Sequence, residues 1–208
     1  MASPMRIRQG ITLEEFLKLP NKRYLEYIDG RVEAKVSPQK KHSILTKGFV
    51  KRLDGWAEPA GLGEAFPELR CTFAGRSIIP DVVFLLDEHI ETDERGDLLD
   101  PTLRPPDLHI EIVSPDQSVR KCQEKLAFSR ANGCPLGWLI DPIRRTVQVY
   151  RPGRRPQRLP DDGGLEGDPI LPGYRLPVAE LFAWLKVRES KPSPSPRSQS
   201  SGQGEPSR

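Results

Sequence analysis

The pattern of apolar and polar residues over the first sixty positions predicts a short helix, a β-hairpin and a longer helix. Thr12 precedes a glutamate by three residues, the spacing of a capping box, so a short helix is expected over Leu13–Lys18. In YLEYIDGRVEAKV the pair Asp29-Gly30, a favoured two-residue turn, separates two alternating stretches and predicts a β-hairpin. Apolar residues then recur at helical spacing from near His42, which predicts an amphipathic helix.

Three apolar stretches in the middle of the chain predict strands over residues 68–73, 78–86 and 108–114. The last two are joined by an acidic segment, residues 87–106. This segment lacks the D-x-D-x-D-G spacing with a terminal glutamate that is typical of a calcium-binding loop. We interpret it as a solvated loop or as a loop that flanks a substrate.

The last third of the chain predicts two helices and two further strands. Residues 118–132 have a helical pattern with Gly133 as the stop, LGWLID and TVQVY are strand-like, and PVAELFAWL closes the domain as a helix. The Gly-rich segment 161–167 is interpreted as a turn. Strands with helices before and among them predict a layered α/β domain, not a helical bundle or a β-sandwich.

Length and composition indicate one domain with short extensions. We expect an N-terminal extension over residues 1–10, a domain over 11–186 and a disordered, Ser- and Pro-rich basic tail over 187–208. The apolar runs are far shorter than the roughly 18 residues of a membrane helix. MASPMRIRQG also lacks the apolar core of a secretory signal. We therefore expect no membrane association and a cytoplasmic location.

Charge and cysteine content limit how the protein could bind phosphate and which roles its cysteines have. The formal net charge is +3, and residues 186–208 carry all of it, so the folded part is neutral. Attraction to phosphate must then come from local basic patches, unless these charges form only a solvated surface. The cysteines at 71, 122 and 134 form no C-x-x-C pair, so we interpret them as small apolar residues. The basic patches are Lys40, Lys41, Arg120, Lys121, Arg144, Arg145 and residues 151–158.

Two carboxylates lie inside apolar strands, where water is scarce. Asp81 follows Pro80 at the head of one predicted strand, and Glu111 lies in another, where alternation puts it on one face with His109 and Val113. Burying an ionised carboxylate without a partner costs several kcal/mol. A shared divalent cation would remove both this cost and the repulsion between the acids. The alternative for Asp81 is a turn residue that begins a strand.

These residues match a known pattern. The Pro80-Asp81 pair, with an apolar strand that carries Glu111 thirty residues later, resembles the PD-(D/E)xK nuclease superfamily, although Val113 stands where its lysine falls. SPDQSVRKCQEKLAFSRANG is similar to the segment in which the Uma-two family of restriction-endonuclease-like proteins carries a migrated lysine, and this matches Lys125. YLEYIDG, GCPLGWLIDP and LPGYRLPVAELF are also similar to that family, so the resemblance spans about residues 11–186. Lys121 and Phe128 depart from it, where an acid and a tyrosine are frequent.

The resemblance implies a restriction-endonuclease-like α/β core: a central mixed sheet flanked by helices, with an N-terminal helix and hairpin. It implies a Mg²⁺-dependent DNA endonuclease in which Asp81, Glu111 and the backbone carbonyl of Ile112 hold Mg²⁺, with Mn²⁺ as a substitute. Lys125 would orient the attacking water or offset charge on the phosphate. A homodimer is expected by analogy with nucleases of this size.

Auxiliary roles and alternatives stay open at this point. Glu26 supplies a further carboxylate or a water contact, or is simply an exposed hairpin residue. His42 contacts phosphate, acts as an auxiliary base or only begins a helix, and His109 supports Glu111. Lys125 could also be a solvated helix residue. The alternative functions are a catalytically inactive nucleic-acid-binding or accessory protein with the nuclease fold, and a protein-interaction domain. P-loop, dinucleotide-binding, H-E-x-x-H and G-x-S-x-G motifs are absent from the sequence.

Overall fold

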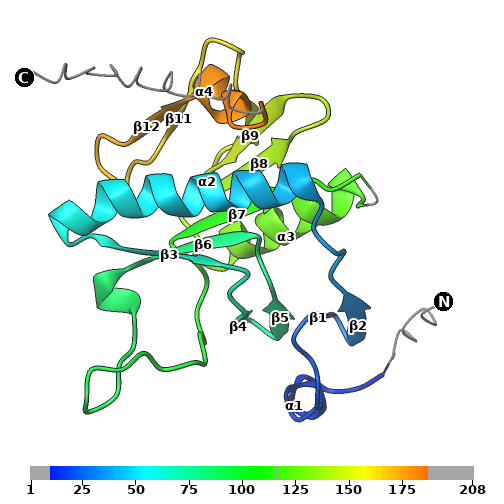
Figure 1. Cartoon of the computed structure of the whole chain (residues 1–208). Helices are drawn as coiled ribbons and strands as arrows, with labels where there is room; N and C mark the ends of the chain where they lie inside the picture. Colours follow the sequence, from blue (N-terminus) through cyan, green and yellow to red (C-terminus); the bar gives the residue numbers. More distant parts are fainter. Residues whose placement is uncertain (1–9, 116, 187–208) are drawn as a thin grey trace, which may run out of the picture.

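The computed structural model describes residues 10–115 and 117–186 and is built around a six-stranded mixed sheet (Figure 1). Its strands are β3 (Gly63–Pro67), β6 (Val82–Leu86), β7 (Leu108–Ile112), β8 (Leu136–Asp141), β9 (Thr146–Tyr150) and β10 (Gln157–Arg158). They lie in the order β10-β9-β8-β7-β6-β3. The β7–β8 pair is parallel, and the other neighbours are antiparallel.

Two helices cover the two faces of this sheet: α2 (Lys40–Ala57) on one side and α3 (Val119–Ala131) on the other (Figure 1). The even-numbered residues of β7 join the apolar cluster that contains Phe49 of α2. Val113, just past β7, instead packs with Cys122 and Leu126 of α3. The layered α/β architecture, with a central mixed sheet flanked by helices, is therefore confirmed, and so is the predicted alternation along β7.

A second, four-stranded sheet has the order β2-β1-β5-β4 and packs beside the first helix. The elements are α1 (Leu13–Leu17), β1 (Leu25–Ile28), β2 (Arg31–Ala34), β4 (Cys71–Phe73) and β5 (Arg76–Ile78). The capping box at Thr12 is formed. Asp29 and Gly30 have φ values of 49° and 79°, as a two-residue hairpin turn requires. The predicted N-terminal helix and hairpin are thus confirmed.

Two of the strand predictions were wrong in their extent. Residues 78–86 do not form one strand, because β5 ends at Ile78 in the small sheet and β6 begins at Val82 in the central sheet. Pro80 lies at the break and cannot donate a ladder hydrogen bond. The predicted strand 68–73 shortens to β4, since Glu68 has a left-handed φ of 52°. Strand β3 was missed because glycine and proline at its ends weaken its pattern.

The C-terminal part packs on the α2 side of the sheet. The segment interpreted as a turn, 161–167, contains the strand β11 (Gly164–Glu166), which pairs with β12 (Arg175–Pro177) before α4 (Val178–Ala183). The turn interpretation failed because glycines mask the alternation. Trp138 is buried, and Trp184 lies edge-on to Phe49, so both residues pack in the core on this side of the sheet. All three cysteines are buried and free, as predicted.

The acidic loop between β6 and β7 begins with a 3₁₀ turn (Asp87–His89) and is exposed over residues 91–100, as expected of a solvated loop. Asp107 ties its two ends together. One carboxylate oxygen accepts a hydrogen bond from the Leu86 N–H at 2.9 Å and lies 2.8 Å from His89 Nδ1. A second 3₁₀ turn, Glu58–Ala60, follows α2.

Within the described residues, no helix combines the length and apolar character needed to cross a bilayer. The predicted tail, residues 187–208, and all but the last residue of the predicted N-terminal extension lie outside the described part of the chain.

Candidate active site

Asp81 lies where the chain passes from the small sheet to the central one. Its N–H donates to the carbonyl of Ile110 at 3.1 Å, and its Oδ2 accepts the Ile112 N–H at 2.7 Å. Lys35 Nζ lies 2.9 Å from Oδ1, and His42 Nε2 lies 3.0 Å from Oδ2. The Asp81 side chain, only 2% exposed, is thus surrounded by donors from three segments. The break at Pro80 frees this side chain from strand packing.

Glu111 is the last residue but one of β7, and its side chain points toward α3. Its Oε1 is 2.6 Å from Lys125 Nζ and 2.8 Å from His109 Nε2. His109 Nδ1 lies 2.8 Å from the Ser129 hydroxyl. Because the carboxylate oxygen needs a donor, we assign the proton of His109 to Nε2, and Ser129 then donates to Nδ1. Glu111 Oε2 is buried and has no hydrogen-bond partner.

Lys125 joins four segments of the chain. Besides Glu111, its ammonium group lies 2.9 Å from Glu26 Oε1 and donates to the Ile79 carbonyl at 3.1 Å. The same Glu26 oxygen accepts the Ile79 N–H at 2.7 Å. Lys125 is 5% exposed, so it is not the solvated helix residue of the alternative interpretation. Glu26 is also buried, and not an exposed hairpin residue.

The charges hold one another ionised in spite of burial. Burial raises the pKa of Asp81, but Lys35, His42 and Lys125 outweigh it and keep this pKa below its ordinary value. Burial and the charge of Asp81 likewise oppose ionisation of Glu111, but Lys125 and His109 together outweigh them and lower its pKa. For Lys125, burial is outweighed by Glu111, Glu26 and Asp81, which raise its pKa above the ordinary range. Lys125 therefore stays protonated at physiological pH.

These shifts predict a loss of stability in acid. Asp81 and Glu111 have ordinary pKa values of 3.8 and 4.5 and lower ones in the folded chain. Each contributes stability above its ordinary value and loses it as the pH falls toward the folded value. We expect the free energy of unfolding by urea to be nearly constant down to about pH 5 and to fall from there to about pH 3. The free energy of unfolding of Glu111→Gln should fall less over this pH range than that of the parent protein. Equal falls in the two proteins would contradict the lowered pKa of Glu111.

The predicted site residues thus gather in one buried cluster, which we call the acid–lysine cluster. One of its members, Lys35, was not predicted, and neither was its neighbour Glu68, a partly exposed residue whose Oε1 lies 3.5 Å from Lys35 Nζ. Lys35 directly follows β2, and nothing in the local sequence distinguishes it from an ordinary exposed lysine at the end of a strand. Only the pairing of the hairpin with β5, Tyr27 opposite Ser77, brings it over Asp81. The acid–lysine cluster comprises Glu26, Lys35, His42, Asp81, His109, Glu111 and Lys125.

Two hollows flank the acid–lysine cluster. One, of about 700 Å³, lies between the hairpin and α3 and is lined by Glu26, Lys35 and Lys125 among others. The other, of about 400 Å³, lies along α2 and is lined by His42 and Lys47 among others. The Lys35–Glu68 contact joins a residue of the first hollow to a residue of the second.

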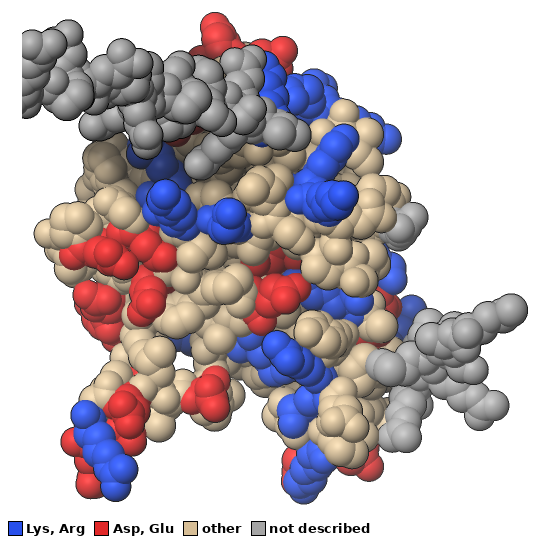
Figure 2. All heavy atoms as spheres, viewed as in Figure 1, with Lys and Arg blue, Asp and Glu red and all other residues tan. Residues whose placement is uncertain are grey.

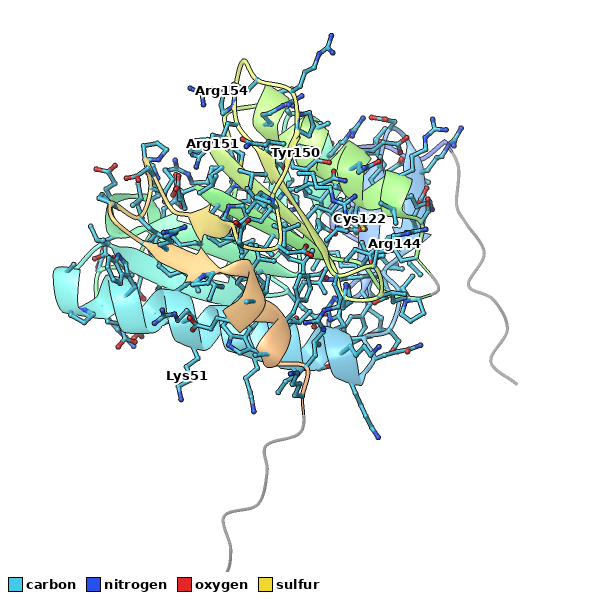
Figure 3. The ribbon with its side chains drawn as sticks, turned by 90° about the horizontal axis from the view of Figure 1, so that it is seen from above. Lys51, Cys122, Arg144, Tyr150, Arg151 and Arg154 are labelled. Atoms are coloured by element: carbon cyan, nitrogen blue, oxygen red, sulfur yellow. The ribbon has the colours of Figure 1, made fainter. Side chains whose placement is uncertain are left out.

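Basic side chains do not form one continuous surface. Figure 2 shows Lys and Arg in several separate groups on one face, with Asp and Glu between them. Several residues of the predicted patches have acidic or carbonyl partners: Arg144 pairs with Asp141, and Arg151 donates to the Glu166 and Asp168 carbonyls. In Figure 3, Lys51 extends from α2 away from the body of the protein. The solvated-surface interpretation therefore holds for part of the predicted patches.

Comparison with known proteins decides the family. The Uma2 family model, described as "Putative restriction endonuclease", matches residues 13–179. The chain belongs to the Uma2 family. The crystal structure of a putative nuclease belonging to DUF820 from Anabaena variabilis ATCC 29413 is 37% identical, with a TM-score of 0.81, and the match covers 85% of this chain and 99% of that one. The predicted resemblance and the restriction-endonuclease-like core are confirmed.

Other comparisons add little to the Uma2 assignment. A cryo-EM structure of a DrdV–DNA complex matches with a TM-score of 0.34 and 17% identity, over 58% of this chain and 82% of that one, which is too low to support an inference. No curated protein matches the chain.

The departure from the superfamily motif, Val113, and the departures from the Uma2 pattern, Lys121 and Phe128, all have structural partners. Val113 packs against α3, while the ammonium group beside Glu111 comes from Lys125. Lys121 forms an ion pair with Glu33 of the hairpin at 2.6 Å. Phe128 stacks on Phe73 at a centroid distance of 5.0 Å. These contacts leave the acid–lysine cluster undisturbed.

Proposed function

We propose that this Uma2 protein is a divalent-metal-dependent DNA endonuclease that hydrolyses phosphodiester bonds at the acid–lysine cluster. The observation that carries the proposal is that Asp81, directly before β6, and Glu111, in the neighbouring strand β7, lie in one buried cluster with the ammonium group of Lys125, which is 2.6 Å from Glu111. Two acids and a lysine beside two inner strands of a mixed sheet can bind a cation and stabilise charge on a phosphate.

The donor set fits a hydrated Mg²⁺. Glu111 Oε2 is a buried acceptor with no partner, and the cluster holds three carboxylates against two ammonium groups. Mg²⁺ is usually bound through one or two carboxylates and keeps several waters. Among the described residues, no group of three or more His, Cys, Asp and Glu is arranged to hold a metal ion by itself. Asp81, Glu111 and the Ile112 carbonyl would hold the ion, and Mn²⁺ could replace it.

The bound ion would polarise the scissile phosphate and lower the pKa of a coordinated water. Lys125 stays protonated, so it serves as a hydrogen-bond donor and a fixed positive charge and not as a general base. Glu26 orients Lys125, and the His109–Ser129 pair orients Glu111. His42, which lines the hollow along α2, is placed to contact a phosphate or to accept a proton at Nδ1.

DNA is the substrate that we propose, from the family's description as a restriction endonuclease. The neutral folded part and the separated basic groups suggest few phosphate contacts, so binding should weaken only shallowly with salt. Cleavage of both strands would need two copies of the site, which is why we propose a homodimer.

The proposal predicts that the purified protein nicks supercoiled plasmid DNA with Mg²⁺ and stops when EDTA removes the metal. Agarose gels of the plasmid measure the conversion, and a filter-binding assay measures DNA affinity in parallel. DNA binding without nicking in Mg²⁺ or Mn²⁺ would instead support the catalytically inactive accessory role. Neither binding at low salt nor nicking would support a protein-interaction domain.

A further inference from the structure

Lys35 is the member of the acid–lysine cluster for which the proposed reaction has no use. Its side chain is 7% exposed, and its ammonium group lies 2.9 Å from Asp81 Oδ1. It also lies 3.4 Å from the Pro80 carbonyl and 3.5 Å from Glu68 Oε1. A lysine buried to this degree over a candidate metal ligand needs a reason.

The contact places two cations in competition for one oxygen. Asp81 Oδ2 already faces the Ile112 N–H and His42 Nε2, so Oδ1 is the oxygen left for a metal ion. Lys35 lies against this oxygen at the distance of a charge-assisted hydrogen bond. A divalent ion binds Oδ1 more weakly while the ammonium group stays there, because the two positive charges repel each other at one ligand oxygen.

We propose that Lys35 is an exchangeable counter-cation of Asp81, which neutralises the acid when no metal is bound and moves away when a divalent cation binds. This inference rests on the metal site of the proposed function. Lys35 is here a positioning residue that acts through Asp81 and sets the metal affinity.

The surroundings of Lys35 allow this movement. It follows the last residue of β2, and its flexible stem borders the hollow of about 700 Å³. Glu68, whose side chain is 35% exposed, offers a second anionic partner nearer to solvent. Lys125 has no such freedom, because Glu111, Glu26 and the Ile79 carbonyl hold it from three sides. Lys35 is therefore the cluster cation that can leave.

Removing the competitor should tighten metal binding. We expect Lys35→Met to lower the dissociation constant of Mn²⁺ about 10-fold or more, measured by electron paramagnetic resonance of free Mn²⁺ without DNA, since an ion pair no longer has to break. Mn²⁺ should also raise the melting temperature of this variant more than that of the parent. Lys121→Met is the matched control: Lys121 lines the same hollow but pairs with Glu33, so its loss should leave the Mn²⁺ affinity within about 2-fold.

A second variant changes the affinity in the opposite direction. Glu68→Gln removes the alternative partner of Lys35, so Lys35 should stay on Asp81 and Mn²⁺ should bind about 3-fold more weakly or worse. Glu33→Gln, a carboxylate of the first hollow that contacts Lys121 instead, is its control. This pair keeps the test decisive even if Lys35→Met does not fold.

The outcomes separate this inference from the proposed function. If the parent binds Mn²⁺ and Lys35→Met binds it equally or more weakly, the exchange is wrong while the metal site stands. If neither protein binds Mn²⁺ at millimolar concentration, the exchange and the metal-dependent function are both wrong.

Discussion

Lys125→Met should slow Mg²⁺-dependent nicking about 100- to 1,000-fold while DNA affinity changes less than about 2-fold, the loss typical of one charge-stabilising donor. The reason is the position of the ammonium group, which is buried at 2.6 Å from Glu111 and not exposed on the surface. Single-turnover nicking rates and filter binding measure the two quantities separately.

The same change should destabilise the protein. Glu111 and Glu26 would keep their contacts with His109 Nε2 and the Ile79 N–H but lose their shared cation. Removing one partner of a buried ion pair costs about 3–5 kcal/mol, so nicking must be measured below the melting temperature of the variant. Lys121→Met, on the same helix but exposed, is the control for both effects. Equal losses of rate and DNA affinity in Lys125→Met would show that Lys125 binds DNA and does not act on the reaction.

Asp81→Asn should abolish nicking and weaken Mn²⁺ binding by more than about 100-fold. The amide can keep a hydrogen bond with the Ile112 N–H, but it carries no charge to hold a metal ion. Substitution of a residue that only supports a metal ligand lowers metal affinity roughly 10- to 100-fold, and substitution of the ligand itself should lower it further. Titration calorimetry with Mn²⁺ measures the affinity, and circular dichroism confirms folding.

Asp107→Asn makes a sharp control for this change. Asp107 is also a buried aspartate bound by a histidine and a backbone N–H, but it lies just before β7, away from the acid–lysine cluster. Its substitution should lower stability and leave Mn²⁺ affinity unchanged. If both variants lost metal binding together, the loss would reflect general unfolding and not a ligand at Asp81.

Local rules predicted most of the fold. The Thr12 capping box and the Asp29-Gly30 turn each fix a nearby conformation, and the alternation along β7 sorts its side chains between two helices. These local rules failed where pairing with segments distant in the sequence determines the structure. The apolar run through Pro80 looks like one strand, but its halves pair with different partners, β1 and β4 on one side and β3 and β7 on the other.

The site residues also divide into those that local sequence predicts and those that depend on distant segments. Asp81 and Glu111 could be predicted because a carboxylate in an apolar strand is costly without a partner. Lys125 could be predicted only through the family resemblance, since a lysine on a helix is usually solvated. Lys35 could not be predicted, because its contact with Asp81 depends on where the hairpin docks against β5. Pairing between strands that are distant in the sequence, and not local sequence, completes the cluster.

The most direct test of the central claim is a crystal structure of the protein soaked in Mn²⁺, with anomalous scattering used to locate the ion. We expect one peak, bound by carboxylate oxygens of both Asp81 and Glu111, with Lys35 turned away from Asp81. An empty cluster at millimolar Mn²⁺, or an ion held elsewhere with the Lys35–Asp81 pair intact, would contradict it.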